Sequence, residues 1–89
     1  MIRELKEIEW NGKAGDPVYL RFSNLPIAKT EAYASGEVNV DLDHYSEVVG
    51  IEMLSIDPDE WEAVALIGKA HRLRFDLLLS AARKRGETV

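Results

Sequence analysis

GEVNVDLDHYSEVVGIEMLSI, residues 36 to 56, contains two runs of alternating apolar and polar residues separated by a short polar loop. In an antiparallel register that pairs Leu42 with Val49, the apolar residues of both runs lie on one face. The six residues of this predicted core face are Val38, Val40, Leu42, Val49, Ile51 and Met53. The stretch therefore predicts a β-hairpin with one buried face and one mostly polar face.

The hairpin belongs to a chain of 89 residues, which we expect to form a single domain over residues 1–89. A domain of this size buries roughly 60–65% of its unfolded surface, so an additional interface would add to a modest stability. The chain contains no Cys, which excludes disulfides, thiolate zinc sites and thiol catalysis. Its apolar runs are too short to cross a bilayer, and its charged start, MIRELKEIEW, is unlike a signal peptide. We expect a cytoplasmic protein without membrane contact.

Three segments before the hairpin have the features of β-strands. Residues 18–22, VYLRF, alternate apolar and polar side chains, and residues 27–33 follow a turn at NLP. Residues 5–10 are consistent with a first strand, although residues 1–10 also fit a helical turn. Because no helical pattern separates these segments, residues 1–56 predict an antiparallel β-meander of four or five strands.

The periodicity changes at Asp57, where the sequence DPDE provides an N-cap, a proline at the first helical position and acidic residues in the first turn. Residues 57–86 then carry apolar residues at helical spacing and end at a glycine. The residues predicted to form the buried underside of this helix are Leu66, Leu73 and Leu77. The predicted fold class is therefore α+β, with the sheet followed by one long C-terminal helix.

The predicted helix has a wider apolar surface than one partner can cover. One strip contains Leu66 and Ile67, and an adjoining strip contains Val64 and Phe75. We expect one strip to pack on the sheet and the other on a second copy, which predicts a homodimer. Gly68 marks a kink, a close helix crossing or a tolerated weak point.

Two segments, VYLRF at residues 18–22 and VDLDHYSEVVGIEML at residues 40–54, resemble strands of the forms LYIRL and VDLDEDGRVVGIEIL. These forms are typical of a family of small prokaryotic proteins known as a domain of unknown function, numbered two thousand two hundred and eighty-three. The resemblance implies a compact β-rich domain without an assigned activity, and an antitoxin-like role, since some members lie beside small toxin-like genes. Ser46 stands where the family usually has Gly, which predicts another turn geometry. Asn11 replaces an acidic residue of the family pattern.

Candidate chemistry in the sequence is sparse. Asp41, Asp43, His44 and Glu47 bring hard ligands near one loop, but their spacing is not that of a calcium loop, and a solvated hairpin edge is the preferred interpretation. His71 interrupts the apolar arc of the predicted helix and either meets a partner or lies at a dimer seam. A nucleophile elbow, a phosphate loop and a dinucleotide fingerprint are all missing. We expect no enzyme, no catalytic residue, no metal site and no cofactor.

The charge is distributed unevenly, with −6 in residues 1–57 and +1 in residues 58–89. The net charge of −5 and the apolar helix favour a non-catalytic, homo-oligomeric module that binds a small basic protein. The alternative is a nucleic-acid-binding regulator that uses the basic end of the helix, although a pI of about 4.9 disfavours it. Arg72, Arg74 and Arg83 are the predicted partner contacts.

Overall fold

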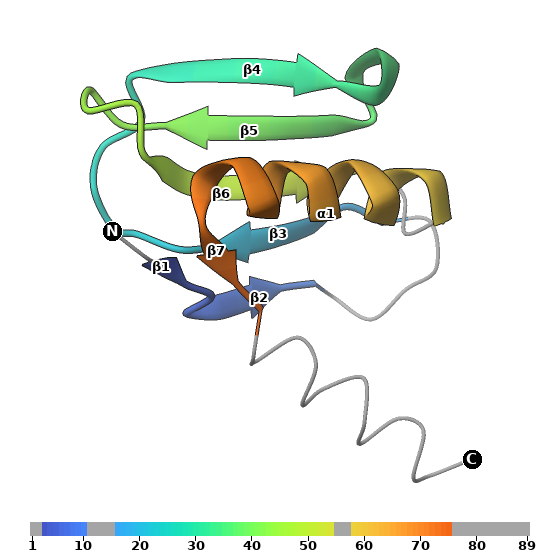
Figure 1. Ribbon diagram of the computed structural model, residues 1–89, viewed down its shortest axis with the longest axis horizontal. Coiled ribbons are helices and arrows are strands. Elements are labelled where there is room, and N and C mark those ends of the chain that lie inside the picture. The colour runs from blue at the N-terminus through green and yellow to red at the C-terminus, as the bar shows by residue number, and fades with distance from the viewer. Residues whose placement is uncertain (1–2, 11–15, 55–57, 76–89) are drawn as a thin grey trace, which may run out of the picture.

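The computed structural model describes residues 3–10, 16–54 and 58–75, and in this part of the chain one helix lies across a five-stranded antiparallel sheet (Figure 1). In chain order the elements are β1 (Arg3–Glu4), β2 (Glu7–Glu9), β3 (Val18–Arg21), β4 (Lys29–Tyr33), η1 (Ala34–Gly36), β5 (Val38–Leu42), β6 (Val48–Met53), α1 (Pro58–His71) and β7 (Leu73–Arg74). The strand order in the main sheet is β2-β3-β6-β5-β4. The predicted α+β class and the antiparallel sheet are confirmed.

The predicted hairpin forms β5 and β6, and its register is correct over the four pairs from Val38 with Met53 onward. The prediction is wrong at Leu42, which pairs with Val48 instead of Val49. A β-bulge causes this difference, because one extra residue of β6 is inserted between two ladder positions. All six predicted core residues of the hairpin are nevertheless buried.

The bulge brings a backbone acceptor toward the end of β3. The carbonyl of Val49 accepts hydrogen bonds from the backbone N–H groups of Phe22 and Ser23, at 2.8 and 3.1 Å. In the loop before the bulge, Ser46 has a φ of 63°, in the left-handed region that glycine favours. Ser46 therefore adopts a backbone conformation that glycine takes more readily than other residues.

The predicted meander is wrong in its strand order. β6 lies beside β3, with Leu20 opposite Ile51, whereas β4 lies at the far edge beside β5. Strands β3 to β6 therefore form a Greek key. β4, β5 and β6 are consecutive neighbours in the sheet, and the connection after β3 leads to the far edge, so that β3 lies beside β6 and not beside β4. The physical reason is the difference in polarity between β4 and β6. β6 is buried at every residue except one, while four of the five residues of β4 are exposed and suit an edge.

The first strand, predicted over residues 5–10, is β2 and is shorter than predicted, and β1 lies outside the predicted range. β1 precedes the buried residue Leu5, and β2 follows as the edge of the main sheet beside β3. β1 itself pairs in parallel with β7. For residues 3–10 the alternative of a helical turn is therefore wrong.

The predicted single helix over residues 57–86 is wrong at residues 72–75, because α1 ends at His71, and residues 76–86 lie outside the described residues. Arg72 has a left-handed φ of 56°, and the chain then continues as β7. The extended conformation buries Leu73 in the core and lets backbone N–H groups of the β1 segment donate to β7 and the residue before it, at 2.8 and 3.1 Å. The predicted core residue Leu77 lies outside the described residues.

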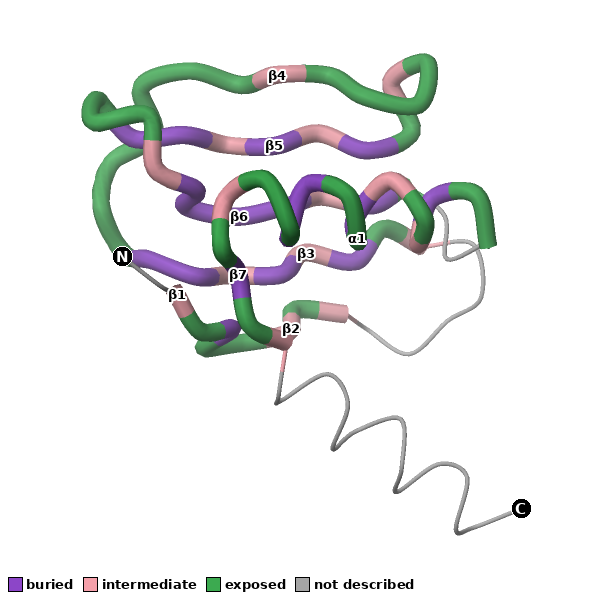
Figure 2. The backbone as a smooth tube through the Cα atoms, in the orientation of Figure 1, coloured by how far each residue is buried: buried purple, intermediate pink, exposed green. Residues whose placement is uncertain are grey.

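The core lies between α1 and the facing side of the sheet, where the buried segments of both layers meet (Figure 2). Gly68 of α1 is buried because the ring of Phe75 packs against it, so that an added Cβ would lie 2.5 Å from Phe75 Cε2. Phe75 also meets Phe22 edge-on, with the ring centroids 5.5 Å apart. Gly68 therefore marks a close approach of an aromatic ring and not the close helix crossing that was one of the predicted alternatives.

Within the described residues, α1 is not long and apolar enough to cross a membrane.

Candidate functional site

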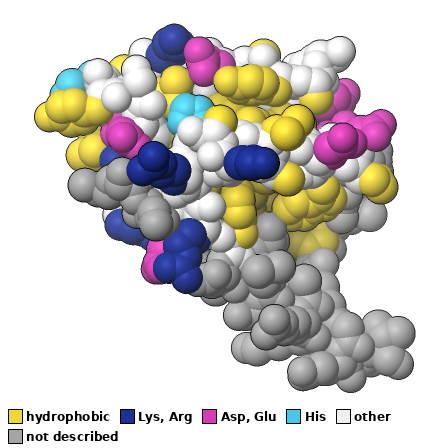
Figure 3. All heavy atoms as spheres, viewed as in Figure 1, with side chains coloured by type: hydrophobic (Ala, Val, Ile, Leu, Met, Phe, Trp, Pro, Cys, Tyr) yellow, Lys and Arg dark blue, Asp and Glu magenta, His cyan; other side chains and the backbone are white. Residues whose placement is uncertain are grey.

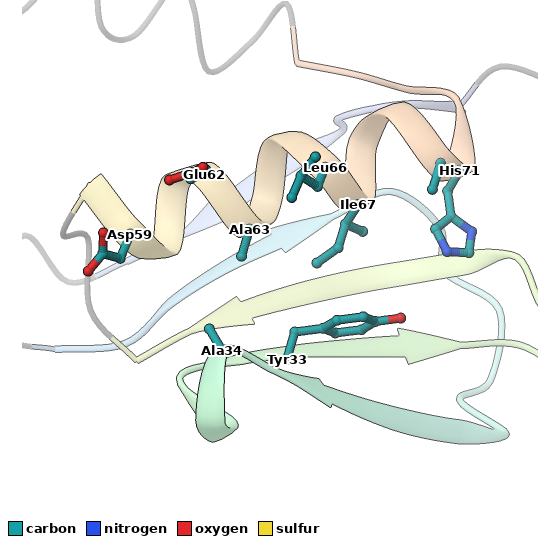
Figure 4. A pocket seen from close by; sticks show the side chains of 9 residues that line it. Tyr33, Ala34, Asp59, Glu62, Ala63, Leu66, Ile67 and His71 are labelled. Atoms are coloured by element: carbon teal, nitrogen blue, oxygen red, sulfur yellow. The ribbon is translucent and has the colours of Figure 1, made fainter.

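A groove of about 510 Å³ runs between α1 and the corner where β4 meets η1, and we call it the α1 groove (Figure 4). The ring of Tyr33 lies on the sheet side of the groove, and Ile67 lies on the helix side. The residues that line it are Tyr33, Ala34, Asp59, Glu62, Ala63, Leu66, Ile67, Ala70 and His71. Most of them are apolar, so the groove is a hydrophobic surface open to solvent.

The groove exists because α1 has more apolar surface than the sheet covers. Val64 and Ile67 are buried, whereas Leu66 is 65% exposed. The helix packs over β5 and β6, and β4 lies beyond it at the edge of the sheet (Figure 1). The prediction that Leu66 lies in the core is therefore wrong, and Leu66 belongs to the uncovered part of the helix surface.

The two ends of the α1 groove differ in charge. Asp59 and Glu62 line the end where α1 begins, and His71 lines the opposite end (Figure 4). The space-filling view shows apolar side chains between the helix and the β4 edge, with acidic side chains gathered near the start of α1 (Figure 3). A ligand that fits both features would combine apolar groups with positive charge.

An ion pair on β4 lies beside Tyr33 of the groove. Glu31 accepts a hydrogen bond from the Tyr33 hydroxyl at 3.2 Å and forms an ion pair with Lys29 at 3.1 Å. Lys29 first and Tyr33 second hold the pKa of Glu31 below its usual value, so this group stays ionised. Burial and the bond to Glu31 raise the pKa of the Tyr33 phenol.

The arginines predicted as partner contacts do not share a helix face. Arg72 is exposed in the turn after α1, and Arg74 lies on β7, where its guanidinium is 3.3 Å from Glu4. Arg83 lies outside the described residues. The predicted basic helix end is therefore interrupted by the turn and by β7.

Asp43 is buried instead of lying on a solvated hairpin edge, with only 2% of the residue exposed. Its Oδ1 accepts hydrogen bonds from the backbone N–H groups of Tyr45 and Glu47, at 2.8 and 3.1 Å. An arginine nitrogen of Arg3 lies 3.7 Å from Oδ2, which has no hydrogen-bond partner among the described residues. Asp43 closes the β5–β6 loop. An aspartate at the start of a short polar loop is the sequence signal for this role.

The other candidate ligands near this loop point to different surroundings. Asp41 lies on the face of the sheet opposite α1, and His44 stacks on Tyr45 with the ring centroids 4.0 Å apart. Glu47 lies 3.4 Å from Arg3. In the part of the chain that the structure describes, no three His, Cys, Asp or Glu side chains converge in a metal-binding arrangement.

A hydrogen-bonded group crosses the sheet face opposite α1. Asp41 accepts hydrogen bonds from the Tyr19 hydroxyl at 2.8 Å and from the Thr30 hydroxyl at 2.6 Å. The ring of Tyr19 lies over Gly50, where any side chain would collide with it, and the guanidinium of Arg21 is 5.1 Å from the ring centroid. Burial first, and the bond to Asp41 second, raise the pKa of Tyr19.

Replacing Tyr19 with phenylalanine is expected to lower the free energy of unfolding by about 1 kcal/mol at pH 7, because one hydrogen bond is lost. Below pH 10, the usual pKa of tyrosine, Tyr19 is protonated in both the folded and the unfolded chain. The wild type therefore keeps the full stabilisation from this hydrogen bond in that range. Above that value the unfolded chain ionises first, so the advantage shrinks as the pH rises. Urea unfolding of both proteins between neutral and alkaline pH measures the difference, with Tyr45→Phe, at an exposed tyrosine, as the control. A difference that stays constant in alkali would contradict the expectation.

Comparisons with family models, with curated proteins and with solved structures find no match to this chain. The resemblance of residues 18–22 and 40–54 to a family of small prokaryotic proteins stays a prediction. A functional assignment for this chain therefore rests on the geometry of the α1 groove and on the charges around it.

Proposed function

We propose that this protein is a non-catalytic, homo-oligomeric interaction module whose α1 groove binds an amphipathic segment of a small basic protein. Leu66 is the observation that carries the proposal. It is a large apolar side chain, 65% exposed, among other apolar residues in a groove of about 510 Å³. A groove of this kind beside a helix is a surface into which the apolar side chains of an amphipathic helix can pack.

The charge around the groove supports a basic partner. Among the described residues, the groove lining contains the carboxylates of Asp59 and Glu62 and, apart from His71, no basic side chain. The whole chain carries a net charge of −5. An amphipathic helix could place apolar anchors against Leu66 and its lysines or arginines near the carboxylates. Neutralising a basic protein in this way is an antitoxin-like role.

The alternative, nucleic-acid binding, has less support. Phosphate binding needs several cations on one surface. Arg74 is paired with Glu4, and Arg72 lies in the turn beyond α1. Asp59 and Glu62 would repel a phosphate backbone from the groove.

The variant Leu66→Asp tests the groove. We expect it to weaken binding of the basic partner about 30-fold or more, because a charge replaces the central apolar contact. Its free energy of unfolding should change by only about 0.5 kcal/mol, since Leu66 is largely exposed. The partner is first isolated by affinity capture with the wild type, and its affinity is then measured by isothermal titration calorimetry.

Leu25→Asp is the matched control, because Leu25 is 42% exposed and does not line the groove. It should bind the partner as the wild type does. Equal affinity of the wild type and Leu66→Asp for the captured partner would contradict the assignment of the groove. A partner that is strongly acidic would contradict the charge argument.

A further inference from the structure

β4 is an edge strand. It pairs with β5 on one side, and in the described residues no strand lies on its other side. All five of its residues pair with β5 in one unbroken register, and none of them is proline. The opposite edge, β2, has three residues. A regular edge strand presents a row of unpaired backbone N–H and C=O groups that another strand can use.

We propose that two copies of this chain associate by antiparallel pairing of β4 with β4, about a twofold axis that passes through Thr30. In this register Lys29 lies opposite Glu31 of the second copy, and Glu31 lies opposite Lys29 of the second copy. Ile27, two residues before β4, lies at the end of the seam near Tyr33 of the second copy. Ile27 is 53% exposed and Tyr33 is 37% exposed, so pairing covers apolar surface at both ends of the seam.

The charge pattern of β4 selects this register. A twofold axis at Lys29 would place two lysines opposite each other, and an axis at Glu31 would place two glutamates opposite each other. Like charges directly opposite destabilise a strand pair, whereas opposite charges stabilise it. The axis at Thr30 is the one between these two positions, and it pairs each lysine with a glutamate.

The existing ion pair is compatible with this arrangement. Lys29 and Glu31 lie on the same side of β4, with their charged atoms 3.1 Å apart. A lysine on an edge strand normally opposes pairing with another chain. Here the four charges of the two copies lie at the corners of a square and alternate in sign, so that each lysine has one carboxylate along its own strand and one across the seam.

The pairing leaves the helix side of the α1 groove outside the seam, whereas Tyr33 belongs both to the groove and to the seam. A twofold axis perpendicular to the sheet joins the two main sheets edge to edge and places both α1 helices on the same face. Leu66 stays available for a basic partner. The inference rests on the proposed function only in taking the protein to be a homo-oligomer, and it moves the dimer contact from α1, where the sequence predicted it, to β4.

Cysteine cross-linking tests the register, because the chain has no Cys of its own. Directly opposite residues in an antiparallel pair have Cα atoms about 4.5–5.5 Å apart, which is within the reach of a disulfide. Thr30→Cys is therefore expected to form a covalent dimer under mild oxidation. In Ala32→Cys, the matched control, the two introduced thiols would lie about 13 Å apart along the seam and should not cross-link. Equal cross-linking of these two variants, or preferential cross-linking of Leu66→Cys, would overturn the proposal.

A charge exchange tests the contacts independently. Lys29→Glu and Glu31→Lys, each alone, are expected to raise the dimer dissociation constant about tenfold, because each places like charges opposite each other. The double variant Lys29→Glu/Glu31→Lys keeps the net charge and should restore dimerisation. Sedimentation equilibrium of the full chain measures all four proteins. A wild type that is monomeric at every concentration, or a double variant as weak as the single ones, would overturn the proposal.

The two proposals can fail separately. A β4 variant that is monomeric should still bind the basic partner through Leu66. Conversely, Leu66→Asp should still dimerise in sedimentation. Loss of dimerisation in Leu66→Asp would show that the contact lies on α1 and would overturn the β4 pairing.

Discussion

Phe22→Ala is expected to lower the free energy of unfolding by about 3–5 kcal/mol, because a large buried ring is removed and a cavity remains. Phe22 is 1% exposed and follows directly after β3. Its ring meets Phe75 edge-on, and Phe75 in turn packs against Gly68 of α1. Small domains are stable by about 5–15 kcal/mol in total, so this single change should remove a large share of the stability.

Urea unfolding followed by circular dichroism and tryptophan fluorescence measures the effect of Phe22→Ala. Phe22→Leu should cost less, because it keeps most of the apolar volume. Leu25→Ala, at an exposed leucine nearby, is the control and should change the free energy of unfolding by no more than about 0.5 kcal/mol. A loss below about 1 kcal/mol for Phe22→Ala would show that the ring does not hold the helix end to the sheet.

The second large effect is expected for Asp43→Ala, at about 2–4 kcal/mol. The substitution leaves the backbone N–H groups of Tyr45 and Glu47 without their acceptor. It also removes the carboxylate that faces Arg3 at 3.7 Å. Both hydrogen bonds go to a buried carboxylate, and hydrogen bonds to a charged group contribute more to stability than those between neutral groups.

Asp43→Asn separates the two causes. The amide oxygen of asparagine can still accept both hydrogen bonds, whereas the charge beside Arg3 is lost. We expect this variant to cost clearly less than Asp43→Ala in urea unfolding and to keep the amide protons of Tyr45 and Glu47 protected from hydrogen exchange. Equal losses for the two variants would place the effect in the ion pair rather than in the closure of the loop.

The central hairpin could be predicted because its apolar alternation is long and regular. The register failed only at Leu42, where the bulge depends on the β3 segment. The backbone N–H groups of Phe22 and Ser23 donate hydrogen bonds to the carbonyl of Val49. These partners lie outside the hairpin, so the hairpin sequence alone does not predict the bulge. The predicted strand order is wrong because it places strands that follow one another in the sequence side by side, without regard to the polarity of each strand. The polar composition of β4 already indicates an edge strand.

The length of the helix could not be predicted from spacing alone. Leu73 and Phe75 continue the apolar pattern of α1, but their spacing of two residues also fits a short strand. In the structure Leu73 belongs to β7, which pairs with β1, and Phe75 packs against Gly68. Which apolar strip of α1 packs inward depends on where the sheet ends beneath it. The sequence therefore indicated an uncovered apolar surface, but it did not indicate that Leu66 would be its centre.

The phenol of Tyr19 has a consequence for how the chain can associate. It starts on β3, passes over β6 at Gly50 and ends on Asp41 of β5, so it fastens three neighbouring strands together. If the hairpin opened to exchange strands with another molecule, the hydrogen bond between Tyr19 and Asp41 would first have to break. The protein can therefore offer its outer strand to a second copy while its central hairpin resists domain swapping.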